Sequence, residues 1–413
     1  MVNSTDLVYG WVSANCGRGT IDILWSCLST IILCVWTAIH LPVPQYPLKW
    51  PLTTRKQIVR SRIVPAMIFM VAPEMLTYTA IVELLYAWKA TQELKKVLCD
   101  DDVSLVHGFF LEMGGFCLKS DEDNYRQIDI VDIASLSGPG SRPTSTDEDV
   151  ESQLAKQKNS HNSTECVAIE THLQWVKELG RRSKGEINNT ANSDALTKLI
   201  TCAQALWFAT QVISRLAEHQ AVTLLEVSTS AYVFCAVAAY AAWWRKPQGS
   251  KTPLMINCSE NTMAQERITS YSRVEGTWKE FIWGGNDWFQ LMNKYLPIWH
   301  IGLLTLLATA YGACYVAAYN ITLPSNIELW LWRASALYCL AFGLYVGLFL
   351  TTLRPSNNPS TTSLILLKYL TGLIMALYTI VRVYMLMQVL VSLRAQPQSA
   401  YESIRWSTFV PHI

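Results

Sequence analysis

The sequence has few charged residues and none of the short motifs that mark common soluble enzymes. Only 16% of its 413 residues are charged, compared with roughly 25% in an average soluble protein. Glycine-rich phosphate-binding loops, a metalloprotease HExxH motif and a hydrolase GxSxG motif are all absent. The formal net charge is +1, without the basic excess of a nucleic-acid-binding protein. We therefore expect neither a nucleotide-dependent enzyme nor a nucleic-acid partner.

Cysteine pairs with metal-ligand spacing are also missing. The 11 cysteines are scattered, and no CxxC pair or Cys/His cluster occurs, so we expect no metal site, no disulfide scaffold and no cofactor. Several of them lie inside apolar segments, namely Cys27, Cys34, Cys202, Cys235 and Cys339. The first twenty residues lack both the basic and the apolar region of a secretory signal. The first apolar segment should therefore remain as a membrane anchor.

Long apolar segments are the main feature that the sequence does contain. A helix needs about 20 mostly apolar residues to cross a bilayer. Six segments meet this requirement: Ile21–Leu41, Lys198–Leu216, Val222–Trp244, Leu296–Tyr319, Leu329–Leu353 and Leu364–Leu393. The sequence predicts an all-α, polytopic membrane helical bundle with six to seven transmembrane helices and the lipid bilayer as a partner.

A seventh segment, Ile63–Trp88, is apolar but contains Pro65, Pro73, Glu74 and Glu83. Proline disrupts a helix interior but suits a first helical turn. We predict a short apolar helix, a break at Pro73 and an amphipathic helix to about residue 98. This pair is expected to lie in the membrane interface or to re-enter the membrane.

The distribution of cations predicts the orientation in the membrane. Five cations and no acid follow the first span, at Lys49, Arg55, Lys56, Arg60 and Arg62. Such loops face the cytosol. If the seventh segment does not cross, the cations after Trp244 are cytosolic too, and the sequon at Asn320 is lumenal. We expect a glycoprotein of the endoplasmic reticulum or another endomembrane, with both termini in the lumen.

Three regions follow from this topology. Residues 1–98 hold the lumenal N-terminus, the first span and the broken helix pair. Residues 99–197 form a cytosolic loop, in which the Ser-, Pro-, Gly- and acid-rich stretch 135–163 is predicted to be disordered. Residues 198–413 form a bundle of five transmembrane helices with a cytosolic loop at 247–294.

Ionisable groups within the apolar segments are the candidates for chemistry. Asp22 and His40 lie eighteen residues apart, which is about five helical turns, so they share one helix face. Each could instead lie at its own interface with water. Glu226 lies one turn into a span, where either an interface acid or a functional acid is consistent with its position. Arg382 lies near the middle of a span and requires a buried acid or a hydrated cavity, and Asp22 and Glu226 are possible partners.

Two further groups of residues have both structural and functional interpretations. The apolar run His107–Phe116 is too short to span; it indicates a packed connector, with His107 and Glu112 as alternative acid/base candidates. Trp25, Trp36 and Trp207 lie within spans, where an indole ring can stabilise a cation or belong to an interfacial aromatic belt.

The chain resembles a large family of fungal integral membrane proteins. The matching stretches are Gly17–Thr20 with Ile23–Leu28, Cys34–Leu41, Ala72–Glu74, His107–Phe110 with Met113–Phe116, Gln204–Phe208, Leu225–Val227, Trp243–Pro247 and Phe409–Ile413. Some members resemble membrane-bound terpene cyclases of meroterpenoid gene clusters. The resemblance implies cyclisation of a farnesyl-type chain attached to an aromatic head group.

The functional prediction is therefore a terpene cyclase that protonates an alkene or an epoxide from a buried carboxyl. The candidate donors, in order, are Asp22, Glu74 and Glu226, with His40 as hydrogen-bond partner or final base. The three span tryptophans would bind the substrate along the cation path. A small-metabolite transporter and a non-catalytic membrane scaffold are the alternatives.

Overall fold

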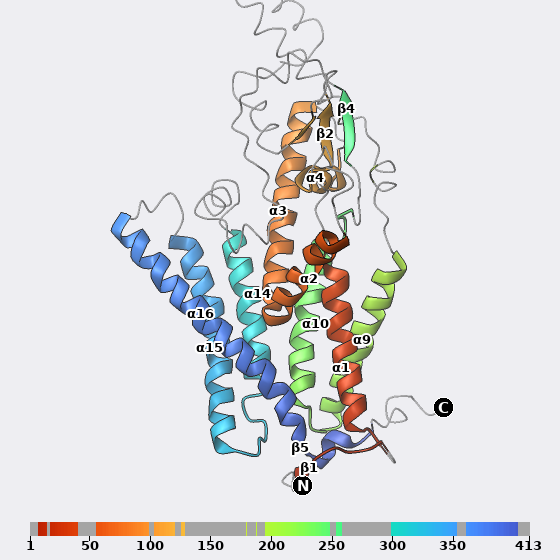
Figure 1. Ribbon diagram of the computed structural model, residues 1–413, viewed down its shortest axis with the longest axis vertical. Helices are drawn as coiled ribbons and strands as arrows, with labels where there is room; N and C mark the ends of the chain where they lie inside the picture. Colours follow the sequence, from red (N-terminus) through yellow and green to blue (C-terminus); the bar gives the residue numbers. More distant parts are fainter. Residues whose placement is uncertain are drawn as a thin grey trace, which may run out of the picture.

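The protein is a bundle of long helices, as the sequence predicts (Figure 1). The computed structural model describes residues 7–14, 17–39, 55–98, 103–119, 125–128, 179, 187, 195–247, 253–257, 299–352 and 361–403. Among these, five helices are long and apolar enough to cross a membrane: α1 (Thr20–Ala38), α10 (Leu224–Ala242), α14 (Trp299–Val316), α15 (Asn326–Thr352) and α16 (Thr361–Val391). The chain is an integral membrane protein with an all-α architecture. His40 and the stretch 135–163 lie outside the described residues.

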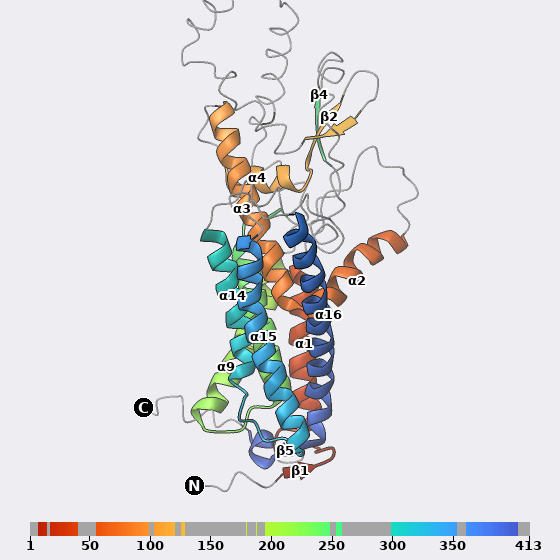
Figure 2. The same ribbon diagram turned by 90° about the vertical axis from the view of Figure 1, so that its left-hand side faces the viewer.

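Helix α9 (Ala195–Ala217) matches the predicted second span in position but is not among those five helices. It packs beside α1 and α10 within the same bundle (Figure 2). Its polar side chains bond to neighbouring elements. The Gln204 amide donates to the Thr30 hydroxyl at 3.1 Å, and Arg215 is buried at its C-terminal end. These polar contacts explain why α9 is less apolar than its neighbours.

The predicted break at Pro73 is confirmed. Helix α2 (Arg55–Val71) ends one residue before α3 (Pro73–Leu98) begins, and the two helices are bent by 115° at this point. Proline at the first position of α3 has no N–H to leave unpaired. The break lies inside the bundle, and the outer ends of both helices point to the same end of it (Figure 2). The pair therefore enters and leaves the bundle on one side.

The second half of α3 extends beyond the bundle and carries a small head region (Figure 1). The predicted connector forms α4 (Leu105–Glu112) and strand β2 (Phe116–Lys119). Strand β2 pairs antiparallel with β3 (Tyr125–Gln127) and parallel with β4 (Leu254–Asn257). Helix α4 packs directly on α3, because a Cβ atom at Gly108 would lie 2.1 Å from the Ala87 carbonyl oxygen.

The opposite end of the bundle is closed by segments from both ends of the chain. Strand β1 (Leu7–Tyr9) pairs antiparallel with β5 (Ala395–Pro397). Two short 3₁₀ turns, η2 (Ser392–Arg394) and η3 (Gln398–Tyr401), flank β5. This arrangement joins the segment before α1 to the segment after α16, so the first and last helices are fixed to each other.

Replacing Gly343 with Leu is expected to destabilise the bundle by about 1–3 kcal/mol or more, because overpacking forces helices apart. A Cβ atom at Gly343 would lie 2.6 Å from the backbone nitrogen of Thr309 in α14. Thermal unfolding in detergent measures the loss. The matched control is Gly372→Leu in α16, where no atom lies within 4 Å of the added Cβ. Equal melting temperatures for the two variants would contradict the close α14–α15 contact.

Candidate functional site

A cavity of about 410 Å³ lies between α3, α10, α14, α15 and α16. This volume is within the range of about 300–1,000 Å³ that is typical of small-molecule sites. Most of the lining is apolar, including Leu304, Leu307, Phe342, Val346, Phe349 and Met375. Among the lining residues, Glu74 carries the only ionisable carboxyl. The cavity therefore combines a surface suited to an apolar chain with a single acid.

The helix break positions Glu74 in the cavity wall. Glu74 follows Pro73 in the first turn of α3, and its side chain is buried. The Tyr378 hydroxyl of α16 donates a hydrogen bond to Oε1. The second oxygen, Oε2, has no hydrogen-bond partner within the described part of the chain. One oxygen is therefore held in place, while the other is buried and has no partner among the described residues.

Arg382 of α16 is the cation that accompanies this acid. Its side chain is 0% exposed, and its charge interacts with that of Glu74. Its Nε donates to the carbonyl oxygen of Val71, the last residue of α2, at 2.9 Å. The guanidinium lies over the rings of Tyr311 and Tyr315, at 5.2 and 5.0 Å from their centroids. Arg382 therefore interacts with residues on both sides of the helix break, Val71 and Glu74.

The terminal nitrogens of Arg382, Nη1 and Nη2, have no hydrogen-bond partner among the described residues. The nearby Cys339 thiol interacts with Arg382, but sulfur is a weak acceptor. The sequence had suggested Asp22 or Glu226 as the acid for this buried cation. The structure brings Glu74 to it instead, through the bend between α2 and α3.

Four of the predicted site residues lie away from the cavity. Asp22 is exposed at the start of α1, where its Oδ2 accepts a hydrogen bond from the Gly19 backbone at 2.8 Å. Trp25, Trp36 and Trp207 are 74%, 50% and 51% exposed on the outside of the described bundle. Side chains on the outside of a membrane bundle face lipid, so these indoles do not line the cation path that the sequence suggested.

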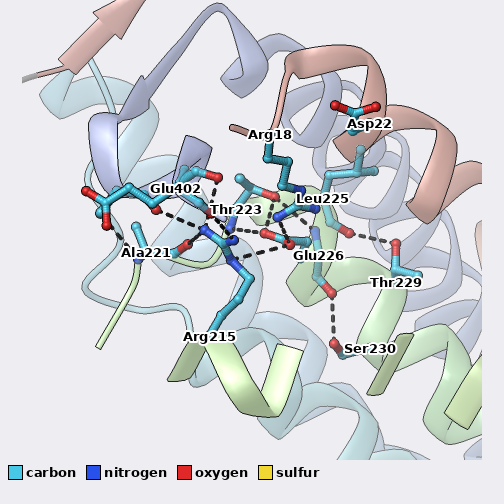
Figure 3. A network of polar contacts seen from close by, with 12 residues as sticks. Arg18, Asp22, Arg215, Ala221, Thr223, Leu225, Glu226, Thr229, Ser230 and Glu402 are labelled. Carbon is cyan, nitrogen blue, oxygen red and sulfur yellow. Dashed lines mark hydrogen bonds and ion pairs between the residues drawn. The ribbon is translucent and has the colours of Figure 1, made fainter. Parts of the chain in front are cut away.

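Glu226 lies in a polar network (Figure 3). Glu226 is in the first turn of α10, at the end of the bundle that carries β1 and β5 (Figure 1). Its Oε1 accepts from Arg18 Nη1 at 2.5 Å and lies 3.8 Å from Arg215 Nε. Its Oε2 accepts from the Thr223 backbone at 2.8 Å, which completes the N-terminal cap of α10. Arg215 also donates to the carbonyl oxygens of Ala221, Ser399, Ala400 and Glu402. This network joins four chain segments.

Replacing Glu226 with Gln is expected to destabilise the protein by about 2–4 kcal/mol, because Arg18 and the buried Arg215 lose their countercharge. Thermal unfolding measures the effect. The control is Glu328→Gln, which breaks a surface pair with Arg394 whose arginine side chain is 53% exposed, and which should lower stability by less than about 1 kcal/mol. Similar losses for the two variants would argue against a structural role of the Glu226 network.

His107 and Glu112 belong to α4 in the head region. His107 is buried, and its Nδ1 accepts a hydrogen bond from the Ser104 backbone at 3.1 Å, which caps the start of α4. Glu112 is half-buried at the last position of this helix. Both positions agree with a packed connector.

Comparison with known proteins identifies a family but no function. The profile of the "Family of unknown function (DUF8562)" matches residues 2–276 and 300–413. No curated protein matches the chain, and no solved structure matches it. The cavity, Glu74 and Arg382 are therefore the basis for a functional argument.

Proposed function

The chain belongs to the DUF8562 family of unknown function, whose profile covers nearly its whole length, and we propose that it is a membrane-bound terpene cyclase. The substrate would be a farnesyl-type chain attached to an aromatic group. The observation that supports this most is the position of Glu74, the one carboxyl in the wall of a mostly apolar cavity inside a membrane bundle. A prenyl chain partitions into lipid and fits such a surface.

Glu74 acts as the general acid in this proposal. A proton leaves Oε2, and the electrons of the broken O–H bond stay on the carboxylate. With an alkene, the π electrons form the new C–H bond and leave a carbocation. With an epoxide, a lone pair of the oxygen forms the new O–H bond, and cleavage of a C–O bond leaves the carbocation. The carboxylate that remains is stabilised by the Tyr378 hydroxyl and by the charge of Arg382. Deprotonation of the cyclised cation completes the reaction, so no net proton is consumed.

An aromatic wall on α15 replaces the predicted tryptophans as the cation-stabilising surface. Phe342, Tyr345 and Phe349 line the cavity, and their rings follow one another at centroid distances of 6.4 and 6.1 Å. The faces of aromatic rings attract cations, most strongly in dry sites. Carbocations formed along a folded prenyl chain would pass these rings.

Expression in a heterologous host fed with farnesyl hydroquinone tests the function. Membranes that contain the protein should convert this probe to cyclic isomers of the same mass, which mass spectrometry with chromatography separates; membranes without it should not. Accumulation of unchanged probe inside sealed vesicles would instead favour a transporter, the second candidate, for which the broken α2–α3 pair is the supporting feature. If neither result is obtained, a non-catalytic scaffold is the remaining candidate.

The proposed orientation places the head region in the cytosol and the β1–β5 end in the lumen of the endoplasmic reticulum. A glycosylation reporter inserted after Leu98 should remain unmodified, because both outer ends of the α2–α3 pair lie on the cytosolic side. The same reporter inserted after Ser325, between α14 and α15, should be glycosylated. The reverse glycosylation pattern would show that the protein has the opposite orientation in the membrane.

A further inference from the structure

A series of buried hydroxyl groups leads from the β1–β5 end of the bundle toward Glu74. Ser228 lies in the second turn of α10, and its Oγ is 3.4 Å from the hydroxyl of Tyr315. The Tyr315 hydroxyl is 3.1 Å from that of Tyr311, one turn further into α14. All three side chains are buried. Helix α10 begins and α14 ends at this end of the bundle (Figure 1), so the hydroxyls run inward from it.

Unsatisfied buried polar atoms occur on Arg382 and on Glu74. Arg382 lies over both tyrosine rings, and its Nη1 and Nη2 have no hydrogen-bond partner in the described part of the chain, like Oε2 of Glu74. A buried donor or acceptor left unpaired costs about 1–3 kcal/mol. Ordered water binds where two to four polar groups converge. Water bound between these atoms would satisfy their hydrogen bonds.

We propose that Ser228, Tyr315 and Tyr311, with water held by Arg382, form a proton path that reloads Glu74 after each turnover. This inference rests on the proposed function, in which Glu74 loses a proton to the substrate. Ser228, the outermost of the three hydroxyl-bearing residues, lies in the second turn of α10, near the end of the bundle that carries β1 and β5. In the cyclase these residues are positioning residues, because none of them lines the cavity.

The proton balance of this path is simple. Each hydroxyl receives a proton from the preceding group and passes its own proton to the next. For each proton that reaches the Glu74 carboxylate, one proton enters the path from the solvent. No electron is transferred, and Arg382 keeps its charge throughout. The base that deprotonates the cyclised cation returns one proton to the solvent in each cycle.

Infrared spectroscopy in D₂O tests the path without a substrate. The carbonyl band of a protonated Glu74 is identified as the band that Glu74→Gln removes, and its shift after transfer to D₂O gives the exchange rate. Tyr315→Phe, which removes only a hydroxyl, should slow this exchange about tenfold or more, and Ser228→Ala should slow it as well. The matched control is Tyr338→Phe, whose hydroxyl donates to the Ile374 carbonyl oxygen at 2.9 Å and which should exchange as the wild type does.

The outcomes separate the path from the function. An exchange rate that neither Tyr315→Phe nor Ser228→Ala changes would overturn the path and leave the role of Glu74 intact. If no infrared band depends on Glu74, the proposal that Glu74 is the general acid is overturned. With farnesyl hydroquinone, Tyr315→Phe should keep the rate of the first turnover and slow the later ones, whereas a purely structural defect would slow both.

Discussion

Replacing Glu74 with Gln is expected to lower product formation by about 10²–10⁴-fold, the usual contribution of a general acid. Glutamine has nearly the same volume, and its carbonyl oxygen can still accept the Tyr378 hydrogen bond. It lacks the acidic proton that the reaction needs. The variant should therefore fold and insert normally. Product is measured by mass spectrometry and normalised to the amount of folded protein in the membranes.

The other candidate acids are the controls for this experiment. Asp22→Asn changes an exposed capping residue, and Glu226→Gln changes a network at the bundle end; turnover per folded molecule should stay near normal in both. The proposal thus ranks Glu74 above Asp22, which came first in the order from the sequence. Near-normal turnover in Glu74→Gln, with loss in His107→Ala or Glu112→Gln, would move the chemistry to the head region.

Replacing Arg382 with Met is expected to destabilise the protein by about 2–4 kcal/mol, because a buried hydrogen bond at the helix break and two cation–π contacts are lost. The Val71 carbonyl oxygen would lose its donor at the helix break, and the rings of Tyr311 and Tyr315 would lose the cation that lies over them. Methionine fills much of the space of the arginine stem, so lost packing contributes little. Thermal unfolding in detergent measures the effect.

A double-variant cycle separates charge coupling from other effects. Combining Arg382→Met with Glu74→Gln should lower product formation per folded molecule little further than Glu74→Gln alone, because Arg382 acts by stabilising the carboxylate that forms at Glu74. The control is Arg333→Met, near the turn between α14 and α15, whose Nε donates to the Tyr319 carbonyl oxygen at 3.0 Å; its effect should add to that of Glu74→Gln. Strict additivity in both pairs would show that Arg382 and Glu74 are independent.

The features that the sequence predicts correctly are those that depend on local chemistry. The long apolar segments formed helices close to their predicted positions, since hydrophobic length alone specifies a membrane helix. The break at Pro73 followed from one residue without an N–H. The interface role considered for Glu226 agrees with its capping contacts in α10. Each of these depends on residues within a few turns of one another.

The site itself depends on contacts that no local pattern encodes. Glu74 and Tyr378 are separated by 304 residues in the chain, and only the packing of α16 against the helix break brings them together. One local signal was present: Tyr378 lies four residues before Arg382, so both share one helix face. The sequence could not show that the span tryptophans lie on the outside of the described bundle, because lipid-facing and core-facing apolar residues are chemically alike in a membrane protein.

Photoaffinity labelling tests the central claim, that the cavity beside Glu74 binds a prenyl chain, most directly. Membranes are irradiated with a farnesyl phenol that carries a diazirine on its chain, and the labelled residues are located by peptide mass spectrometry. The account predicts label on cavity residues such as Phe342, Val346 and Met375, with loss of the label when excess farnesyl hydroquinone is added. Label confined to the outer surface around Trp25, Trp36 and Trp207, without competition, would contradict it.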